Sequence, residues 1–326
     1  MGGCAGSAAR PGRGLAKGLS VGRYVVARIA AILGTLLIIS LFVFVLMHAI
    51  PGGPWDEDRM PLSPASKANL LRSFGLDRPL WQQYLLYLWN AAHLNFGVSY
   101  QRPGESVISL LGHVWPVTMH LGGMALGIAL LGGLGLGVGA ALRQNTPADY
   151  LATGVAVFGL VAPHFVLGSL LILLFSTLLG WLPAGGWDTP RHWILPTITY
   201  SLAPLGVVAR YARVSILEVL TADHVRTAWA KGLNARRVVL RHVLRNAMIP
   251  LITIIGPLVP DLLTGSLFVE GIFRVPGLGH YFVTSVYDRD YPMIMGLVLL
   301  GTLLISATYL LSDLLYLVAD PRIRYV

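Results

Sequence analysis

Long apolar runs constrain this chain more than any other feature. A membrane core about 30 Å thick is crossed by roughly 20 apolar residues in a helix, because every backbone amide must be bonded internally there. Five runs reach this length: Ile29–Met47, Val117–Leu142, Leu151–Leu179, Ala247–Ile272 and Met293–Ala319. A sixth run, Ile194–Ala209, is shorter and contains Pro196 and Pro204. The chain is therefore predicted to be an all-α membrane protein with six transmembrane helices.

Charge is sparse and unevenly placed along the chain. Only 12% of the residues are charged and 55% are hydrophobic, whereas about 25% of the residues of a soluble domain are charged. Of the 24 Lys and Arg, 16 lie in segments that six spans place on the side of the N-terminus. The positive-inside rule then favours cytoplasmic N- and C-termini. We expect residues 1–23 to be a disordered cytoplasmic tail and residues 24–326 to be the membrane domain.

The longest predicted external segment covers residues 48–114, between the first and second spans. Within it, Leu80, Tyr84 and Leu88 recur at helical spacing over Pro79–Leu94, with Trp81, Tyr87 and Trp89 nearby. This pattern predicts an amphipathic helix at the membrane surface, with its aromatic rings at the level of the lipid headgroups. The segment could form a cap over a pore entrance, or it could serve as an interfacial anchor alone.

A nucleotide site within the chain is excluded by its lysines. A phosphate-binding P-loop needs Gly-Lys followed by Ser or Thr, and Lys17, Lys67 and Lys231 each follow Ala or Ser. If the chain moves a solute, the energy comes from an ion gradient or from ATP hydrolysed by another subunit. An ion-coupled carrier usually carries several ionisable groups in its spans. Here Asp261 and Asp313 are the acids placed clearly within the membrane, so a gradient-driven carrier stays open as the alternative.

Catalysis and metal binding have little support. The nine histidines are scattered without His-x-x-His, His-x-His or His-Glu-x-x-His spacing, and a single cysteine is present. We predict neither a metal site nor a catalytic residue, and a membrane enzyme is the third interpretation after the two kinds of transporter. His164, beside Pro163, is interpreted as the sole candidate histidine within a span. We predict that it forms a hydrogen bond to a neighbouring helix.

The cytoplasmic segment between the fourth and fifth spans, residues 215–247, is predicted to contain two short helices. They cover Asp223–Lys231 and Ala235–Asn246, with Gly232 supplying the positive φ that ends the first and Asn234 capping the second. The second helix would carry arginines on one face and an apolar stripe on another. The arginines could meet lipid headgroups, whereas a role in reading DNA fits poorly, because two spans confine the segment. The arginines are Arg237, Arg241 and Arg245, and the stripe is Val239, Val243, Leu240 and Leu244.

Several motifs resemble one family. Ala228 and Gly232 stand where importer permeases of the ATP-binding cassette superfamily carry Glu-Ala-Ala-x-x-x-Gly, and the runs from Val225 to Gly232 and from His242 to Pro250 resemble its dipeptide/oligopeptide/nickel branch. Arg226 replaces the Glu of the superfamily signature, as is usual in this branch. Other motifs in the same order as in the family are Pro51-Gly-Gly-Pro54, Phe74-Gly-Leu-Asp-Arg-Pro79, Trp81-Gln-Gln-Tyr84, Pro276-Gly-Leu-Gly279, Arg289-Asp-Tyr-Pro292 and Asp320-Pro-Arg-Ile-Arg324.

The resemblance implies a type I importer permease in a bacterial or archaeal cytoplasmic membrane. Its partners would be a second, similar permease subunit, two ATPase subunits that use ATP and Mg²⁺, an external substrate-binding protein and membrane lipid, with no cofactor on this chain and no nucleic acid. Relatives carry peptides, nickel chelates, glutathione or oligosaccharides, and we expect peptides here. The segment that couples to the ATPase would contain Val225, Arg226, Thr227, Ala228, Lys231, Gly232 and Leu233.

Prolines, glycines and acids within the spans suggest a translocation path. Pro163 and Pro257 predict kinks that could line a cavity or act as gates. Asp261 would be costly unpaired at mid-membrane, so it should face water, a partner subunit or a cationic group of the substrate. Glu270 is a further path candidate, although hydrogen bonds from loop amides to Glu270 and Asp290 are the simpler expectation. The many glycines of the second span predict close helix packing.

Overall fold

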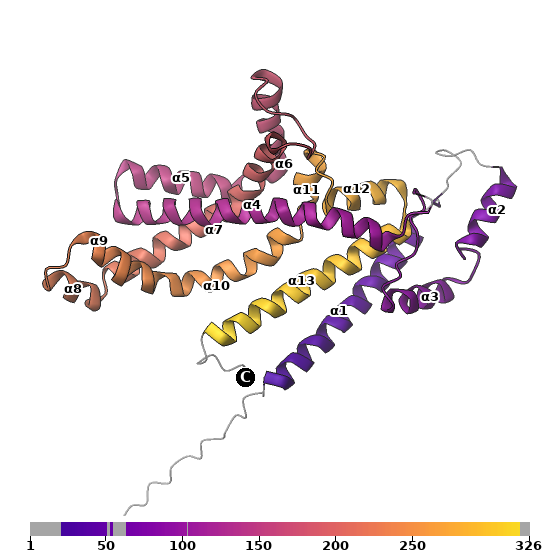
Figure 1. Ribbon diagram of the computed structural model, residues 1–326, viewed down its shortest axis with the longest axis horizontal. Helices are drawn as coiled ribbons and strands as arrows, with labels where there is room; N and C mark the ends of the chain where they lie inside the picture. Colours follow the sequence, from indigo (N-terminus) through magenta and orange to yellow (C-terminus); the bar gives the residue numbers. More distant parts are fainter. Residues whose placement is uncertain (1–20, 51–52, 55–62, 103, 320–326) are drawn as a thin grey trace, which may run out of the picture.

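A computed structural model describes residues 21–50, 53–54, 63–102 and 104–319 of the chain. This part of the chain is built of helices, without a named strand (Figure 1). Helix α1 takes in the last three residues of the segment 1–23 that we expected to be disordered; the others lie outside the described residues, as do the residues after Ala319. The helices are α1 (Val21–Ala49), α2 (Pro64–Ser73), α3 (Leu80–Ala92), α4 (Val107–Leu142), α5 (Pro147–Val161), α6 (His164–Leu171), α7 (Pro190–Leu220), α8 (Asp223–Ala230), α9 (Ala235–Arg237), α10 (Leu244–Leu263), α11 (Leu267–Ile272), α12 (Leu278–Asp288) and α13 (Tyr291–Ala319), with π-helical turns η1 (Ile172–Leu178) and η2 (Val238–Val243).

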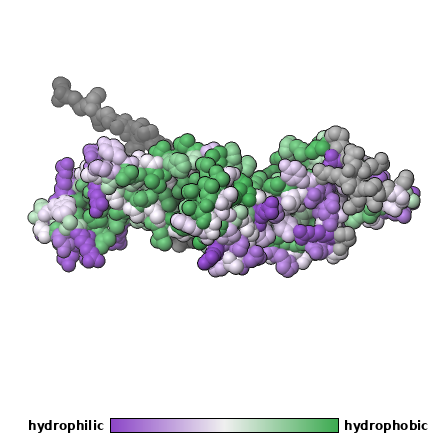
Figure 2. Space-filling view, turned by 90° about the horizontal axis from the view of Figure 1, so that it is seen from above, coloured by the Kyte–Doolittle hydropathy of each residue, from purple (hydrophilic) through white to green (hydrophobic). Residues whose placement is uncertain are grey.

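Two long helices, α4 and α7, form the centre of the molecule. Helices α5 and α10 pack against both of them, while α1 and α13 lie side by side as a second pair (Figure 1). In the space-filling view, apolar side chains gather over the middle of the molecule and hydrophilic ones over its two ends (Figure 2). This distribution is the one that a lipid bilayer requires of a protein that crosses it.

By length and composition, four helical segments of the described chain can cross a membrane, and a fifth can if the bent pair of α5 with α6 and η1 counts as one span. The remaining run, 194–209, lies within α7, whose 31 residues span about 46 Å. Pro196 and Pro204 lie inside this helix without ending it. The number of six spans therefore stays a prediction, although each of the six runs lies in helices.

Two predicted spans are interrupted. The run 151–179 bends by 109° between α5 and α6, at Ala162 and Pro163. The run 247–272 divides into α10 and α11, because Gly265 takes a φ of +91° and Ser266 caps α11 by accepting a hydrogen bond from the Val269 N–H at 3.3 Å. The sequence predicted a kink at Pro257, which lies inside α10. The Gly265-Ser266 pair, which was missed, is the local signal that could have located this break.

The external segment contains the predicted amphipathic helix as α3. Tyr84 attaches it to α1, since its hydroxyl lies 3.0 Å from Ser40 Oγ and its ring packs on Phe44. Leu80, Trp81 and Trp89 stay exposed on the outer face of α3. Helix α4 begins at Val107, inside the segment 48–114, so the second span starts earlier than its apolar run suggested.

The predicted close packing of α4 is confirmed at three of its glycines. A Cβ on Gly122 would collide with the Leu262 carbonyl of α10, and one on Gly133 would lie 2.7 Å from the Val208 Cβ of α7. A Cβ on Gly137 would lie 2.6 Å from both the Ala209 oxygen and the Ala212 Cβ. Without side chains at these positions, helix backbones meet directly and dispersion contacts replace the missing hydrophobic drive.

Glu270 ties three helices together. Its side chain has no exposed surface. The Gly279 N–H donates to Oε2 at 2.7 Å, and the Thr118 hydroxyl of α4 donates to Oε1 at 3.1 Å. Thr118 Oγ1 in turn accepts the Leu278 N–H at 2.8 Å. The carboxylate thus joins α11, α4 and the start of α12, and the expected hydrogen bonding to loop amides is confirmed.

The packing of α4 on α7 can be tested by adding one methyl group. Gly137→Ala should destabilise the protein by about 1–3 kcal/mol, because the new Cβ meets atoms of α7 in a closely packed interface. Gly135 has nothing within 4 Å of its Cβ position, so Gly135→Ala is the matched control and should be neutral or slightly stabilising. Thermal unfolding in detergent micelles measures both. Equal unfolding temperatures for the two variants would contradict the packing assignment.

The Glu270 network can be tested at two fully buried threonines. Thr118→Val removes the donor to Glu270 and the acceptor of the Leu278 N–H, and it should cost about 1–3 kcal/mol because both buried groups lose a partner. Thr199 donates only to the Leu195 carbonyl of its own helix, so Thr199→Val should have a smaller effect. Denaturant unfolding of both variants compares them, and a Thr199→Val variant that is the less stable of the two would refute this role of Thr118.

Candidate functional site

The candidate site is the segment 215–247, predicted to be cytoplasmic, in which α8 packs against the turn η2. Val225 and Ala228 are buried on the inner face of α8. They belong to one apolar cluster with Val238 and Val243 of η2, Ala141 of α4 and Ile216 of α7. Burial of this shared apolar surface holds α8 and η2 at the ends of the two long helices.

The outer face of α8 carries polar side chains and one large aromatic side chain. Arg226, Thr227 and Lys231 are exposed, and Trp229 exposes 47% of its surface. Arg226 lies 3.9 Å from Asp223 in an exposed ion pair, which contributes little to stability. Of the seven predicted coupling residues, Val225 and Ala228 thus face the fold and Leu233 is half-buried, while the other four are open to a partner.

A sharp turn ends α8 as predicted. Gly232 has a φ of +73°, and its N–H donates to the Trp229 carbonyl at 2.9 Å. The Leu233 N–H donates to the Ala228 carbonyl. Asn234 Oδ1 then accepts the Arg237 N–H at 2.9 Å, which caps α9. The two predicted caps are therefore confirmed, and they fix the end of α8 and the start of α9 on the two sides of the turn.

The second predicted helix is not a separate short element. Helix α9, the turn η2 and α10 continue one another from Ala235 to Leu263. The π-helical turn places Val238 and Val243 on the buried side, five residues apart, while Leu240 is 54% exposed. The predicted apolar stripe is therefore wrong at Leu240, because its spacing assumed α-helical periodicity throughout. Arg237, Arg241 and Arg245 are all exposed, as a lipid-facing role requires.

Two polar contacts of this region were not predicted. The Asn246 side-chain amide lies 2.9 Å from His224 Nε2, which ties α8 to the start of α10. Arg213 of α7 forms an ion pair with Asp149 of α5. From the sequence alone, the charges of Asp149 and Arg213 bore only on the orientation of the chain in the membrane. No local motif distinguishes these two residues from the other charged residues of the predicted cytoplasmic segments.

The four path candidates lie in different parts of the bundle. Pro163 precedes α6 at the 109° bend, and Pro257 lies within α10. Asp261 is exposed and accepts a hydrogen bond from the Tyr309 hydroxyl of α13 at 3.2 Å. Glu270 is enclosed by the packing between α4, α11 and α12, so it faces no open space in this conformation. The structure does not bring these four residues together.

The prediction for His164 is wrong at its Nε2. This atom is buried without a hydrogen-bond partner among the described residues, and the ring meets the Tyr200 ring edge-on at 6.2 Å. His120 was overlooked: it also lies in a predicted span, with its ring against those of Trp187 and Trp193. Within the described ranges, no three His, Cys, Asp or Glu side chains are grouped in a way that could hold a metal ion.

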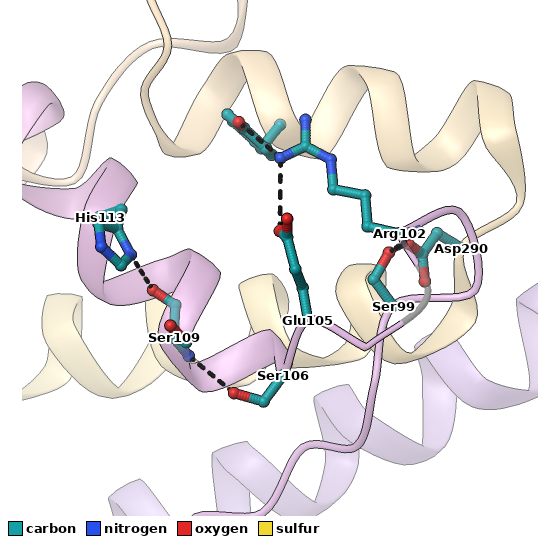
Figure 3. Close-up of polar contacts among 8 residues, drawn as sticks. Ser99, Arg102, Glu105, Ser106, Ser109, His113 and Asp290 are labelled. Carbon is teal, nitrogen blue, oxygen red and sulfur yellow. Dashed lines mark hydrogen bonds and ion pairs between the residues drawn. The ribbon is translucent and has the colours of Figure 1, made fainter.

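On the external side, Asp290 organises the loop before α4. The Ser99 hydroxyl donates to its carboxylate (Figure 3). The Tyr100 N–H also donates to this carboxylate, at 3.1 Å. Burial and the neighbouring Asp290 raise the pKa of Tyr100. Arg102 reaches across to α12, where it donates to the Tyr281 hydroxyl at 3.1 Å and lies over the ring. These contacts fasten the external loop to the segment between α12 and α13.

Comparison with known proteins identifies relatives over nearly the whole chain. Residues 133–325 match the family described as binding-protein-dependent transport system inner membrane component, and residues 21–122 match the description for the N-terminal part of such components. The dipeptide transport system permease protein DppB of Bacillus subtilis is 43% identical over 302 residues, which cover 93% of this chain and 98% of that protein. The oligopeptide transport system permease protein OppB of Escherichia coli K12 is 38% identical over 305 residues, with 93% and 99% covered.

Among solved structures, the MetNI methionine ABC transporter in an inward-facing conformation resembles the fold. The TM-score is 0.54 at 17% identity, over 65% of this chain and 96% of that chain. The all-α class and the importer permease architecture expected from the sequence are thereby confirmed. The chain belongs to the family of binding-protein-dependent transport system inner membrane components, within the branch that contains the dipeptide and oligopeptide permeases.

Proposed function

We propose that this chain is one of two permease subunits of an ATP-binding cassette importer that takes up peptides. One observation carries the proposal beyond family membership: one face of α8 packs on η2, in an apolar cluster shared with α4 and α7, and the other face offers Arg226, Thr227 and Lys231. An element that a partner is to push must be attached to what it moves and stay accessible. Helix α8 meets both conditions.

The proposed assembly contains a second permease subunit, two ATPase subunits and an external substrate-binding protein. The ATPases hold ATP and Mg²⁺, and this chain holds no cofactor. The protein is a multi-pass component of the inner membrane, and we place its N- and C-termini on the cytoplasmic side with α8, because most of the Lys and Arg lie there. The binding protein delivers its cargo to the opposite side, where the segment 48–114 lies.

Peptides are the proposed cargo because the named relatives are dipeptide and oligopeptide permeases that align with 93% of this chain. Nickel chelates, glutathione and oligosaccharides are the alternatives. Closure of the ATPases would displace α8 and tilt the long helices as rigid bodies, so that the path opens alternately to each side.

Proteoliposomes that contain the complete complex test this function. Peptide uptake should require ATP on the side of the membrane that carries the ATPases and the binding protein on the opposite side. Uptake driven by an ion gradient without ATP would reject it.

Gly232→Leu should uncouple the importer. A leucine at a φ of +73° costs roughly 1–2 kcal/mol in the turn and reshapes the end of α8, although the space around Gly232 is open. We expect uptake to fall at least about tenfold while basal ATP hydrolysis persists. Gly139→Leu is the control, since Gly139 is exposed with nothing near its Cβ position and has an ordinary helical φ. Normal uptake by the Gly232 variant would contradict the docking role of α8.

Asp261 is proposed to meet the free amino end of the peptide. Asp261→Asn should then reduce uptake of peptides with a free amino terminus about tenfold, the effect of roughly 1.4 kcal/mol, and should leave N-acetylated peptides unaffected. Tyr309→Phe removes the hydrogen bond to Asp261 without removing its charge and serves as the control. Competitive uptake of labelled peptides measures the ratio. Unchanged uptake of all peptides would instead favour pairing of Asp261 with the second permease subunit.

A further inference from the structure

Asp149 and Arg213 form a bidentate ion pair between α5 and α7. Arg213 Nε lies 2.7 Å from Asp149 Oδ1, and Nη2 lies 2.8 Å from Oδ2. Two parallel hydrogen bonds of this kind fix the relative orientation of the two groups as well as their distance. A lysine at position 213 would supply the charge without this geometry.

The carboxylate of Asp149 is enclosed and fully bonded. Its side chain is 3% exposed, against 27% for that of Arg213. The Asn145 N–H donates to Oδ2 at 3.0 Å, and the Thr153 hydroxyl donates to Oδ1 at 3.4 Å. Asp149 therefore joins three parts of the chain: the turn after α4, the first turn of α5, and α7. An exposed charge that serves only to orient the chain in the membrane needs none of these contacts.

The ion pair lies at the end of the bundle that carries α8. Ile216 follows Arg213 by one helical turn on α7, and it packs with Val225 and Ala228 of α8 and with Ala141 of α4. Figure 1 shows the start of α5 at the same end of the molecule as α8 and α9. Arg213 is thus the last polar attachment of α7 before the contact with α8.

Farther along the interface, α5 and α7 meet through close backbone contacts beside the side chains of Leu160 and Leu202. A Cβ on Gly159 would collide with the Leu202 carbonyl, and one on Gly206 would collide with the Ala156 carbonyl. These apolar contacts resist separation, but dispersion contacts lack the directionality of a hydrogen-bonded ion pair. The ion pair supplies that directionality at the cytoplasmic end, and α5 leads directly to the bend at Pro163.

We propose that the Asp149–Arg213 ion pair is the link through which displacement of α8 reaches α5 and, beyond the bend, α6. The two residues are positioning residues: they touch neither cargo nor ATPase, and they make α4, α5, α7 and α8 move as one body. The inference rests on the proposed importer function. Without the link, α8 and α7 move while α5 and α6 lag behind.

The test uses the complete importer in proteoliposomes. Asp149→Asn combined with Arg213→Gln removes both charges, so that no unpaired charge is left buried and the chain can insert and assemble. We expect uptake to fall about tenfold or more in this double variant, with ATP hydrolysis stimulated by the binding protein retained within about twofold. Arg213→Lys should give an intermediate loss. Glu105→Gln, which breaks the exposed ion pair with Arg102 at 3.9 Å, is the matched control and should change neither activity.

A distance measurement distinguishes a link from a merely structural role. Spin labels replace Tyr150 of α5 and Glu218 of α7, both exposed, in a chain in which Cys4 is changed to Ser. Their separation should be the same in the nucleotide-free and ATP-bound complex when the ion pair is intact, and should change with nucleotide in the double variant. Normal uptake by the double variant, equal loss of uptake and stimulated hydrolysis, or a separation that already changes with the pair intact would each overturn the proposal. If the unaltered complex fails to import with ATP, the proposed function itself has failed.

Discussion

The close approach of backbones around α7 is the constraint on which the rest of the structure depends. Gly133 and Gly137 let α4 touch α7, and Gly159 and Gly206 let α5 touch it from another side. In lipid, apolar side chains gain little by leaving their surroundings, so helices associate through tight contact and a few polar bonds. The position of α7 in turn places Ile216 beneath α8. The proposed docking helix α8 is thus held by packing that begins deep in the bundle.

Much of this fold could be predicted from the sequence, because each long apolar run has to be helical in a membrane. The turn at Gly232 and the cap at Asn234 were also predictable, since both depend on residues within one or two helical turns. Where the sequence was insufficient, the cause was a change of helical geometry. The π-helical turn η2 exposes Leu240, contrary to α-helical periodicity, and Gly265 separates α10 from α11 within a run that was predicted as one span.

The candidate site shows the same division between local and distant causes. Family motifs drew attention to α8, but they could not show which of its residues face the fold and which face outward. The long-range polar contacts lay beyond sequence reasoning: Asp149 and Arg213 are separated by 64 residues, and Thr118 and Glu270 by 152. Asp149 and Arg213 can form an ion pair only because the packing of small residues brings their helices together. Local motifs therefore identified the docking element and missed its anchors.

The continuity of α9, η2 and α10 has a geometric consequence. At a rise of 1.5 Å per residue, the nine residues from Ala235 to Val243 span about 13.5 Å and the 20 residues of α10 span about 30 Å. If this rod pivots where the two parts meet, a shift of 1 Å at the Ala235 end becomes about 2 Å at its far end, which is next to Asp261. The rod then acts as a mechanical amplifier with unequal arms. Its gain is set by the position of the π-helical turn, so inserting or deleting residues on the short arm would change the stroke rather than the strength of the coupling.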